Sequence, residues 1–295
     1  MIKKNKIIVT GGAGFVGTNL IKLLLQKTKY KIISIDNYSS GSKANHIKTS
    51  RVKYLKEETL NIEKVIKKPK EIKTVFHFGE FARIYQSFLR MNECITSNSI
   101  GSNAIFNFCL KNNIKLIYSA TSASLGNKGD DKNLSPYAFS KAKNLELLEN
   151  LKKWFNFKYE VIYFYNVYGP HQICKGHMST VIGIFEEHYK KGRALPVVKP
   201  GTQTRRFTHI DDTINICFLA WRKNLCRHYS IASKASYSLI EVANMFRAKI
   251  KFLPKRPGER YVSALTNKNL SNRMHKHFGK INLKNYIRDF VKKYN

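Results

Sequence analysis

The sequence has few acidic residues, few cysteines and no long apolar segment. Its 295 residues include 19 Asp and Glu against 53 Lys and Arg, together with only five cysteines. These cysteines form no Cys-x-x-Cys pair, which argues against a disulfide framework and favours reduced thiols in a cytoplasmic protein. No apolar run approaches the roughly 18 residues of a membrane-spanning helix, and the N-terminal apolar segment is too short for a signal peptide. We therefore expect a cytoplasmic globular protein.

The formal net charge of +34 is the strongest bias in the composition. A surface this basic attracts nucleic acid, anionic membranes or phosphorylated substrates. The lysines are scattered, however, and Lys, Ile and Asn are all abundant, as an A+T-rich coding sequence would produce. We interpret the charge mainly as compositional drift. Since no nucleic-acid motif is present, we expect no specific nucleic-acid partner and no membrane partner. The histidines lack metal-ligand spacing, so we expect no metal.

Short apolar strands alternate with amphipathic helices through the first half of the chain. We predict strands at 6–9, 31–36, 75–78, 116–119 and 161–165, and helices at 15–25, 92–111 and 136–154. The strands lack period-two alternation, which is typical of a parallel sheet covered on both faces. This predicts an α/β fold, with a Rossmann-type doubly wound parallel sheet formed by 1–169 and by 205–231. We expect 170–204 and 232–295 to form a smaller C-terminal substrate-binding lobe over the carboxyl ends of the strands.

A glycine-rich loop lies directly between the first predicted strand and the first predicted helix. Its glycines are three residues apart, at Gly11, Gly14 and Gly17. Small residues let the backbone approach a pyrophosphate, and a helix N-terminus offers free N–H groups. Asp36 ends the second strand, where a carboxylate can accept both ribose hydroxyls and repel a 2′-phosphate. The pattern favours NAD over NADP as cofactor; the alternative is a glycine turn that only packs the helix on the strand.

Tyr137 and Lys141 are four residues apart at the start of a predicted helix, which places them on one helical face. A free tyrosine has a pKa of about 10, too high for a base at neutral pH. We expect the Lys141 ammonium and a cationic nicotinamide to lower the pKa of Tyr137 toward neutrality. Thr121, just past the end of the strand at 116–119, can offer a hydroxyl to the same substrate oxygen. An isolated Tyr-x-x-x-Lys is common in surface helices, but after a dinucleotide loop we favour catalysis.

Together these motifs resemble the NAD-dependent epimerase/dehydratase family of extended short-chain dehydrogenases, which act on nucleotide sugars. The resemblance covers essentially the whole chain, and continues through 164–170, 204–212 and 256–259. It implies that Tyr137 is the base, that Lys141 holds the nicotinamide ribose and that Thr121 orients the sugar. It implies an NAD site formed by the following residues: Gly11, Gly14, Phe15, Val16, Gly17, Asp36, Asn37, Glu58, Thr59, Phe78, Gly79, Asn98, Tyr137, Lys141 and Tyr165. It implies a substrate site formed by Thr121, Asn166, Val181, Arg205, Arg256, Glu259 and Ser263.

Several residues depart from the family pattern. Glu80 follows Phe78-Gly79 where small residues are usual, and Arg83 lies close by. Arg206 replaces the usual acid after Arg205, and Tyr163 replaces an arginine before Asn166. Glu58-Thr59 stands where an Asp that contacts the adenine is common. None of these departures removes a catalytic group.

One departure bears on the type of reaction. Dehydratases of the family carry a Glu two residues after the catalytic Thr, where this chain has Ala123. Elimination then lacks a proton carrier, whereas epimerisation needs none. We therefore expect a C4 epimerase acting on a UDP-hexose or a UDP-N-acetylhexosamine. The alternatives are another NAD-linked nucleotide-sugar oxidoreductase or dehydratase, and a non-catalytic dinucleotide-binding protein. Separately, we expect the protein to be a homodimer.

The resemblance also bears on which sugar fits. In UDP-galactose 4-epimerases, the residue seven places after the Arg of the Arg-Pro-Gly motif borders the sugar pocket. A tyrosine there excludes an N-acetyl group, and here the position is Ser263. We therefore expect N-acetylated hexoses to be accepted.

Overall fold

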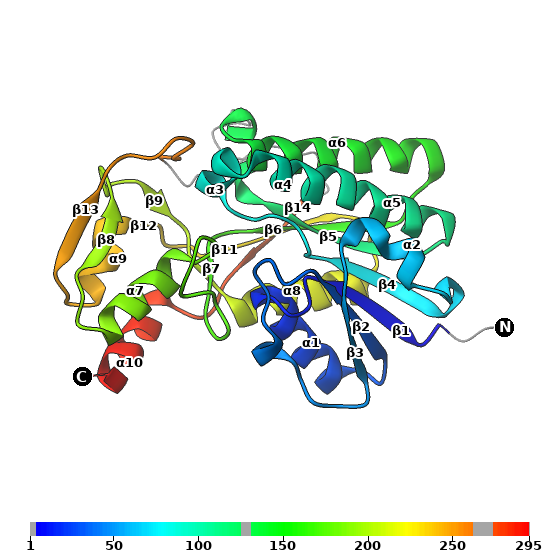
Figure 1. Ribbon diagram of the computed structural model, residues 1–295, viewed down its shortest axis with the longest axis horizontal. Coiled ribbons are helices and arrows are strands. Elements are labelled where there is room, and N and C mark those ends of the chain that lie inside the picture. The colour runs from blue at the N-terminus through cyan, green and yellow to red at the C-terminus, as the bar shows by residue number, and fades with distance from the viewer. Residues whose placement is uncertain (1–3, 125–130, 262–273, 295) are drawn as a thin grey trace.

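The computed structural model describes residues 4–124, 131–261 and 274–294 (Figure 1). Its centre is an eight-stranded sheet in which all neighbouring strands are parallel. The strands are β1 (Lys6–Thr10), β2 (Lys31–Asp36), β3 (Val52–Lys56), β4 (Ile72–His77), β5 (Lys115–Thr121), β6 (Tyr159–Phe164), β11 (His228–Ala232) and β14 (Met274–Phe278). Their order across the sheet is β14-β11-β6-β5-β4-β1-β2-β3. The order therefore reverses between β1 and β4, which confirms the predicted Rossmann-type fold.

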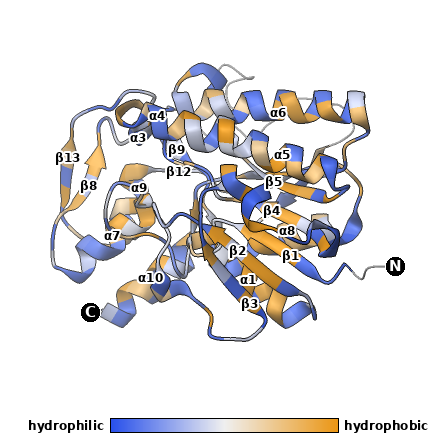
Figure 2. Ribbon diagram, turned by 45° about the vertical axis from the view of Figure 1, so that its right-hand side comes forward, coloured by the Kyte–Doolittle hydropathy of each residue, from blue (hydrophilic) through white to orange (hydrophobic). Residues whose placement is uncertain are grey.

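Helices cover both faces of this sheet (Figure 1). One layer contains α2 (Ile62–Val65), α5 (Ser102–Lys111) and α6 (Pro136–Phe155), and the other contains α1 (Phe15–Lys27) and α8 (Ile210–Lys223). Ile8 packs in the core of the first layer, whereas Ile7 and Val9 pack in the core of the second. Because alternate side chains of a strand point to opposite faces and both faces are covered, the central strands β1 and β5 are mostly apolar (Figure 2).

The predicted helix at 92–111 has an irregular middle. After α3 (Ile84–Leu89) and α4 (Met91–Ile95), the chain makes a π-helical segment, η4 (Thr96–Gly101), before α5. A Cβ at Gly101 would lie 2.3 Å from the Thr59 hydroxyl oxygen, so only glycine fits where this segment crosses the turn after β3. Such π-helical turns often occur at functional sites. Four short 3-10 turns lie in the connections between other elements. They are η1 (Lys43–Asn45), η2 (Thr59–Asn61), η3 (Pro69–Glu71) and η5 (Ser122–Ser124).

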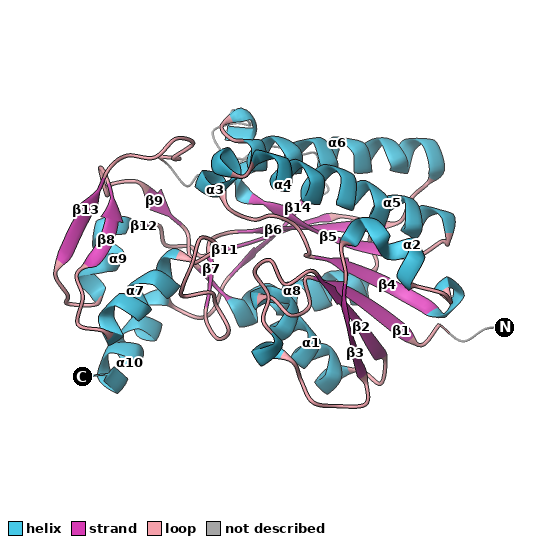
Figure 3. Cartoon of the chain, in the orientation of Figure 1, coloured by secondary structure: helices cyan, strands magenta, loops and turns pink. Residues whose placement is uncertain are grey.

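A smaller lobe lies beyond one end of the main sheet (Figure 3). It contains α7 (Val181–Lys190), β8 (Leu195–Val198), α9 (Leu239–Met245), β13 (Ile250–Leu253) and α10 (Leu283–Tyr294), with β8 and β13 paired in parallel. Its separate apolar core is centred on Phe185, Phe246 and Ile287. Two-residue strands join it to the larger part: β7 (Val167–Tyr168) pairs with β10 (Thr208–His209), and β9 (Thr204–Arg205) pairs with β12 (Tyr237–Ser238).

Two differences from the predicted boundaries concern the division into lobes and the candidate site. Residues 232–295 were expected in the smaller lobe, but β14 within this range pairs with β11 at the edge of the main sheet. Its sequence, Met274-His275-Lys276-His277-Phe278, has no apolar run because an edge strand is partly exposed. Thr121, expected just past a strand, is the last residue of β5. Within the described ranges, every helix is too short or too polar to cross a membrane.

Candidate functional site

The glycine-rich loop connects β1 to α1 and packs closely against the end of β4. Gly11 has a φ of +67°, and a Cβ there would lie 2.9 Å from the carbonyl oxygen of Phe78. A Cβ at Gly17 would lie only 2.1 Å from the carbonyl oxygen of Gly11. Glycine is therefore required at both positions. Gly14 forms the N-cap of α1 without a side-chain hydrogen bond, so the first turn of the helix offers its N–H groups to a ligand.

A cavity opens at the carboxyl ends of β1, β2, β4 and β5, where the strand order reverses. Most of the predicted NAD-site residues line it together: Gly11, Gly14, Phe15, Val16, Gly17, Asp36, Asn37, Glu58, Thr59, Phe78, Gly79, Tyr137 and Lys141. The cavity thus joins an uncapped helix N-terminus, the end of β2 and the Tyr137–Lys141 pair. These three features suit the three parts of a dinucleotide. The helix N-terminus suits the phosphates, the end of β2 suits the adenosine ribose, and the Tyr137–Lys141 pair suits the nicotinamide end.

Asp36 is buried at the end of β2 and anchors the loops around this cavity. Its carboxylate accepts hydrogen bonds from the backbone N–H of Ala13 at 2.9 Å and of Tyr38 at 2.8 Å. Burial raises the pKa of Asp36 from its ordinary value, while these backbone donors act to lower it. Next to it, the Asn37 amide donates to the Glu58 carboxylate at 3.1 Å. The adenosine end of the cavity is therefore lined by acidic groups.

Tyr137 lies in the first turn of α6, whose start is fixed by its own sequence. The Ser135 hydroxyl caps the helix by accepting from the Ala138 N–H at 3.1 Å, and Pro136 occupies the first helical position. The Tyr137 hydroxyl is hydrogen-bonded to Thr121 at the end of β5. One turn further along, Lys141 reaches the same end of the sheet and donates to the Ser119 carbonyl. The structure thus brings the three predicted catalytic residues together.

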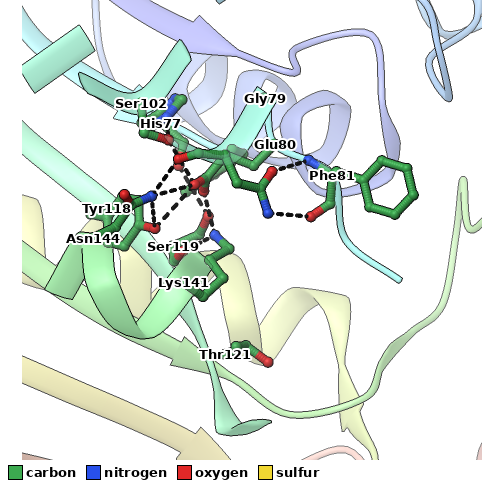
Figure 4. Close-up of polar contacts among 12 residues, drawn as sticks. His77, Gly79, Glu80, Phe81, Ser102, Tyr118, Ser119, Thr121, Lys141 and Asn144 are labelled. Atoms are coloured by element: carbon green, nitrogen blue, oxygen red, sulfur yellow. Dashed lines mark hydrogen bonds and ion pairs between the residues drawn. The ribbon is translucent and has the colours of Figure 1, made fainter. Parts of the chain in front are cut away.

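The Lys141 ammonium also forms a buried ion pair with Glu80, the residue that departs from the family pattern (Figure 4). The two side chains are 4% and 2% exposed. The other carboxylate oxygen of Glu80 accepts from Ser102 Oγ at 2.8 Å and from the Tyr118 hydroxyl at 3.0 Å. Asn144 Nδ2 donates to it at 3.2 Å. Both oxygens of Glu80 are therefore satisfied inside the protein.

This polar network continues beneath the glycine loop. Ser102 Oγ lies 2.9 Å from His77 Nε2, and His77 Nδ1 lies 2.7 Å from the hydroxyl oxygen of Thr10. Burial lowers the pKa of His77 to about 4, so its ring is neutral at physiological pH.

The expected lowering of the Tyr137 pKa is not produced by the protein's own groups. Burial, the largest effect, raises the pKa of Tyr137 to about 12; the hydrogen bond from Thr121 lowers it, and the charge of Glu80 raises it further. The prediction counted the Lys141 ammonium but not the carboxylate paired with it. The correction follows from that ion pair and from desolvation of the phenol.

The structure shows the contacts of four predicted substrate residues: Arg205, Glu259, Asn166 and Arg256. Arg205 on β9 donates to the Glu259 carboxylate at 2.5 Å and to the Arg260 carbonyl at 2.6 Å. Asn166 follows β6 with a φ of +24° and donates to the Arg206 carbonyl at 3.2 Å. The Arg256 guanidinium carbon lies 4.9 Å from the centre of the Tyr85 ring.

Two further residues, Val181 and Ser263, were predicted to contact the substrate. Val181 is the first residue of α7, whose N-terminus is capped by Thr180. Ser263 lies outside the described residues.

Sequence reasoning missed a buried cation beside Thr121. Arg260 is 5% exposed. Its guanidinium donates to the Asp131 carboxylate at 2.6 Å and to Ser122 Oγ at 3.3 Å. It directly follows Glu259, where the family motif ends, so only its position beside that motif could have pointed to it. Through Arg260 the smaller lobe is joined to the turn after β5.

Some residues singled out from the sequence do not line this cavity. The Asn98 amide oxygen accepts from the Phe81 N–H at 2.7 Å, and its amide nitrogen donates to the Phe81 carbonyl at 3.0 Å. Tyr165 is buried just after β6. Tyr163 is also buried, with its hydroxyl 2.9 Å from His228 Nδ1, and Arg206 donates to the Ser233 carbonyl at 3.0 Å.

A second cavity lies elsewhere. It has a volume of about 700 Å³ at the amino ends of the strands, between residues such as Lys27, Lys73, Lys115 and Lys158. It contains none of the catalytic groups, and open parallel sheets bind ligands at the opposite, carboxyl ends. We therefore place the site in the smaller cavity. Over the described ranges, His, Cys, Asp and Glu form no cluster that could hold a metal ion.

Comparison with known proteins identifies relatives of this arrangement. A model of the NAD dependent epimerase/dehydratase family matches residues 7–232. The chain is 28% identical to ADP-L-glycero-D-manno-heptose-6-epimerase of Brachyspira hyodysenteriae, over 83% of this chain and 81% of that protein. A UDP-glucuronic acid 4-epimerase from Bacillus cereus, solved with UDP-glucuronic acid and NAD, superimposes with a TM-score of 0.82 at 25% identity, covering 98% and 100% of the two chains. A dTDP-glucose 4,6-dehydratase from Streptomyces venezuelae gives 0.86 at 17% identity, covering 98% and 96%.

Proposed function

Because the chain belongs to the NAD-dependent epimerase/dehydratase family, we propose that it is an enzyme that epimerises a nucleotide sugar at C4, with a UDP-hexose or UDP-N-acetylhexosamine as substrate. One observation carries this proposal. Thr121, Tyr137 and Lys141 meet at the end of the dinucleotide cavity, while the position of the additional acid of dehydratases is held by Ala123.

NAD⁺, when bound, supplies a hydride acceptor that returns the hydride within the same catalytic cycle. The protein's residues handle the proton. Tyr137 takes the proton of the C4 hydroxyl as the C4–H bond breaks and the C4 carbonyl forms. Thr121 holds the same oxygen by a hydrogen bond. Once the keto sugar has turned its other face to the bound cofactor, Tyr137 would give the proton back to the C4 carbonyl oxygen as that carbon is reduced. Bonds and charges balance without an external oxidant.

Dehydration is the second candidate, since one structural neighbour is a dehydratase. Elimination of water needs a second proton carrier close to Thr121. Of the carboxylates in the described parts of the chain, Glu80 and Asp131 are buried near the site, and both are held in ion pairs, with Lys141 and Arg260. Because each carboxylate is already paired with a cation, neither is placed to carry the second proton. These contacts therefore favour epimerisation.

The proposed function is tested by incubating the purified protein with NAD and a panel of nucleotide sugars that differ at C4. Products are separated by chromatography and identified by NMR. Interconversion of a C4-epimeric pair, with no net NADH formed, supports the proposal. Release of water, or inversion only at another carbon such as C6, would contradict it and would identify the alternative reaction.

Sugar selectivity gives a sharper prediction. Replacing Ser263 with tyrosine is expected to abolish turnover of N-acetylated sugars selectively, because a bulky ring fills the space that an acetamide group needs. The measurement is kcat/KM for acetylated and unacetylated forms of the same sugar nucleotide. A Ser263→Ala variant serves as the control and should accept both. Equal effects of the tyrosine on both substrates would refute the assignment of Ser263 to the sugar pocket.

We also propose that the protein is a homodimer that pairs through α3, α4, η4 and α6. Large apolar side chains remain exposed on these adjoining elements: Leu89 is 64%, Ile100 56% and Met91 54% exposed. Replacing Ile100 with glutamate should convert a dimer to a monomer, since a charge at a packed apolar interface is costly. Sedimentation equilibrium measures the change, with Leu225→Glu, an exposed leucine on another surface, as control. A monomeric wild-type protein, or a dimer that Ile100→Glu leaves intact, would contradict the proposal.

A further inference from the structure

The buried pair of Glu80 and Lys141 is the least expected feature of the site. Lys141 Nζ contacts the Glu80 carboxylate and the Ser119 carbonyl, and it lies 4.7 Å from the centre of the Tyr118 ring. Glu80 also lines the dinucleotide cavity, together with Tyr137 and Lys141. The carboxylate is therefore next to the reacting groups and does not belong to a distant structural ion pair.

The surroundings of Glu80 hold its position tightly. Its four donors come from three elements: Ser102 from α5, Tyr118 from β5, and Lys141 and Asn144 from α6, while Glu80 itself follows β4. A carboxylate that accepts four hydrogen bonds in a buried site is fixed in place. The ammonium it binds is fixed with it.

We propose, on the basis of the function proposed above, that Glu80 is a positioning residue for the reaction: it anchors the Lys141 ammonium and cancels its charge beside Tyr137. Two consequences follow. The first is that the Lys141 ammonium, neutralised by Glu80, places no net positive charge beside the Tyr137 phenol. The base strength of Tyr137 depends on the balance between these two opposite charges.

The other groups that face this pair do not replace its effect. Around Tyr137, the Thr121 hydrogen bond and Arg83 favour the ionised phenol, while Glu80 and Cys94 disfavour it. Around Glu80 lie Tyr118, with a pKa raised well above its ordinary value, and His77, which is neutral at physiological pH. Within the described residues, Glu80 is thus the group whose removal most directly changes the field at Tyr137.

The test is a titration of the Tyr137 hydroxyl in the NAD-bound protein by NMR of tyrosine labelled at Cζ. The Tyr137 signal is assigned by its loss in Tyr137→Phe. In Glu80→Gln, which keeps the shape of the side chain and removes its charge, the pKa of Tyr137 should fall by about one unit, a tenfold change in its ionisation constant. The acid limb of the kcat/KM profile should move to lower pH by the same amount.

The matched control is Glu160→Gln. Glu160 is another buried glutamate paired with a lysine, Lys115, but it lies toward the amino end of the sheet. The Glu160→Gln variant should have a lower free energy of unfolding, and its Tyr137 hydroxyl should titrate as in the wild type. A double variant, Glu80→Gln with Lys141→Met, removes both charges and should return the pKa to within about half a unit of the wild-type value.

The possible outcomes distinguish failure of this proposal from failure of the variant to fold and from failure of the proposed function. A folded Glu80→Gln protein with an unchanged Tyr137 titration would overturn the proposal. If that variant does not fold, the double variant decides: a tyrosine titrating one unit or more above wild type shows that the Lys141 charge was not cancelled. Because the titration needs no sugar, a wild-type protein that epimerises nothing would remove the proposed function and leave this measurement valid.

Discussion

Replacing Tyr137 with phenylalanine is expected to lower turnover of the sugar nucleotide by roughly 10²–10⁴-fold, the contribution of a positioned acid–base group. The substitution removes only the oxygen that is hydrogen-bonded to Thr121. The ring remains, so NAD should still bind. Single-turnover and steady-state assays measure the loss, and calorimetry measures NAD affinity. A variant with near-normal turnover would show that another group is the base.

The control for this experiment is Tyr30→Phe. Tyr30 lies before β2, at the opposite end of the sheet. The centres of its ring and of the Trp221 ring are 5.8 Å apart. Removing its hydroxyl should leave turnover unchanged. The pH dependence adds a second check: because burial raises the pKa of Tyr137 to about 12, the phenol is protonated at neutral pH unless a bound cation favours its ionised form. Wild-type kcat/KM should therefore rise with pH, and the residual activity of Tyr137→Phe should lose this rise.

The parts of the site that could be predicted from the sequence are those encoded by local spacing. Gly11, Gly14 and Gly17 follow a strand and begin a helix, and Asp36 ends the next strand, so chain order alone places them together. Tyr137 and Lys141 share a helical face for the same reason. Each of these relations holds within one strand–helix unit and needs no knowledge of how distant segments pack.

The features that could not be predicted depend on contacts between distant segments. Glu80 was recognised as a departure from the family pattern, but its partners Ser102, Tyr118 and Lys141 are 22, 38 and 61 residues away. No periodicity links such positions. The same reason explains why the raised pKa of Tyr137 was missed: burial and an opposing carboxylate are properties of the packed structure. β14 was missed because its three central residues are polar and give no buried-strand signal.

Cofactor choice gives the second large effect. The wild-type protein is expected to bind NAD at least roughly 100-fold more tightly than NADP, because a 2′-phosphate would lie against the Asp36 carboxylate. Two like charges about 4 Å apart in a partly buried site repel by about 4 kcal/mol at an effective dielectric constant of 20, enough for this ratio even after solvent screening. Asp36→Asn keeps the shape of the side chain and an acceptor oxygen for the Ala13 or Tyr38 N–H. It should therefore reduce the ratio of the two dissociation constants by roughly 10- to 100-fold.

The net charge of the protein makes the conditions of this measurement important. A charge of +34 attracts both dinucleotides non-specifically, and NADP more strongly, so the titrations need to be repeated at high ionic strength, where long-range attraction is screened. Asp289→Asn, which removes an exposed carboxylate on α10, changes the net charge equally and should leave the NAD to NADP ratio unchanged. A wild-type protein that binds both cofactors equally at high salt would contradict the role of Asp36. So would an Asp36→Asn variant whose preference is unaltered, because the discrimination would then come from the shape of the cavity and not from its charge.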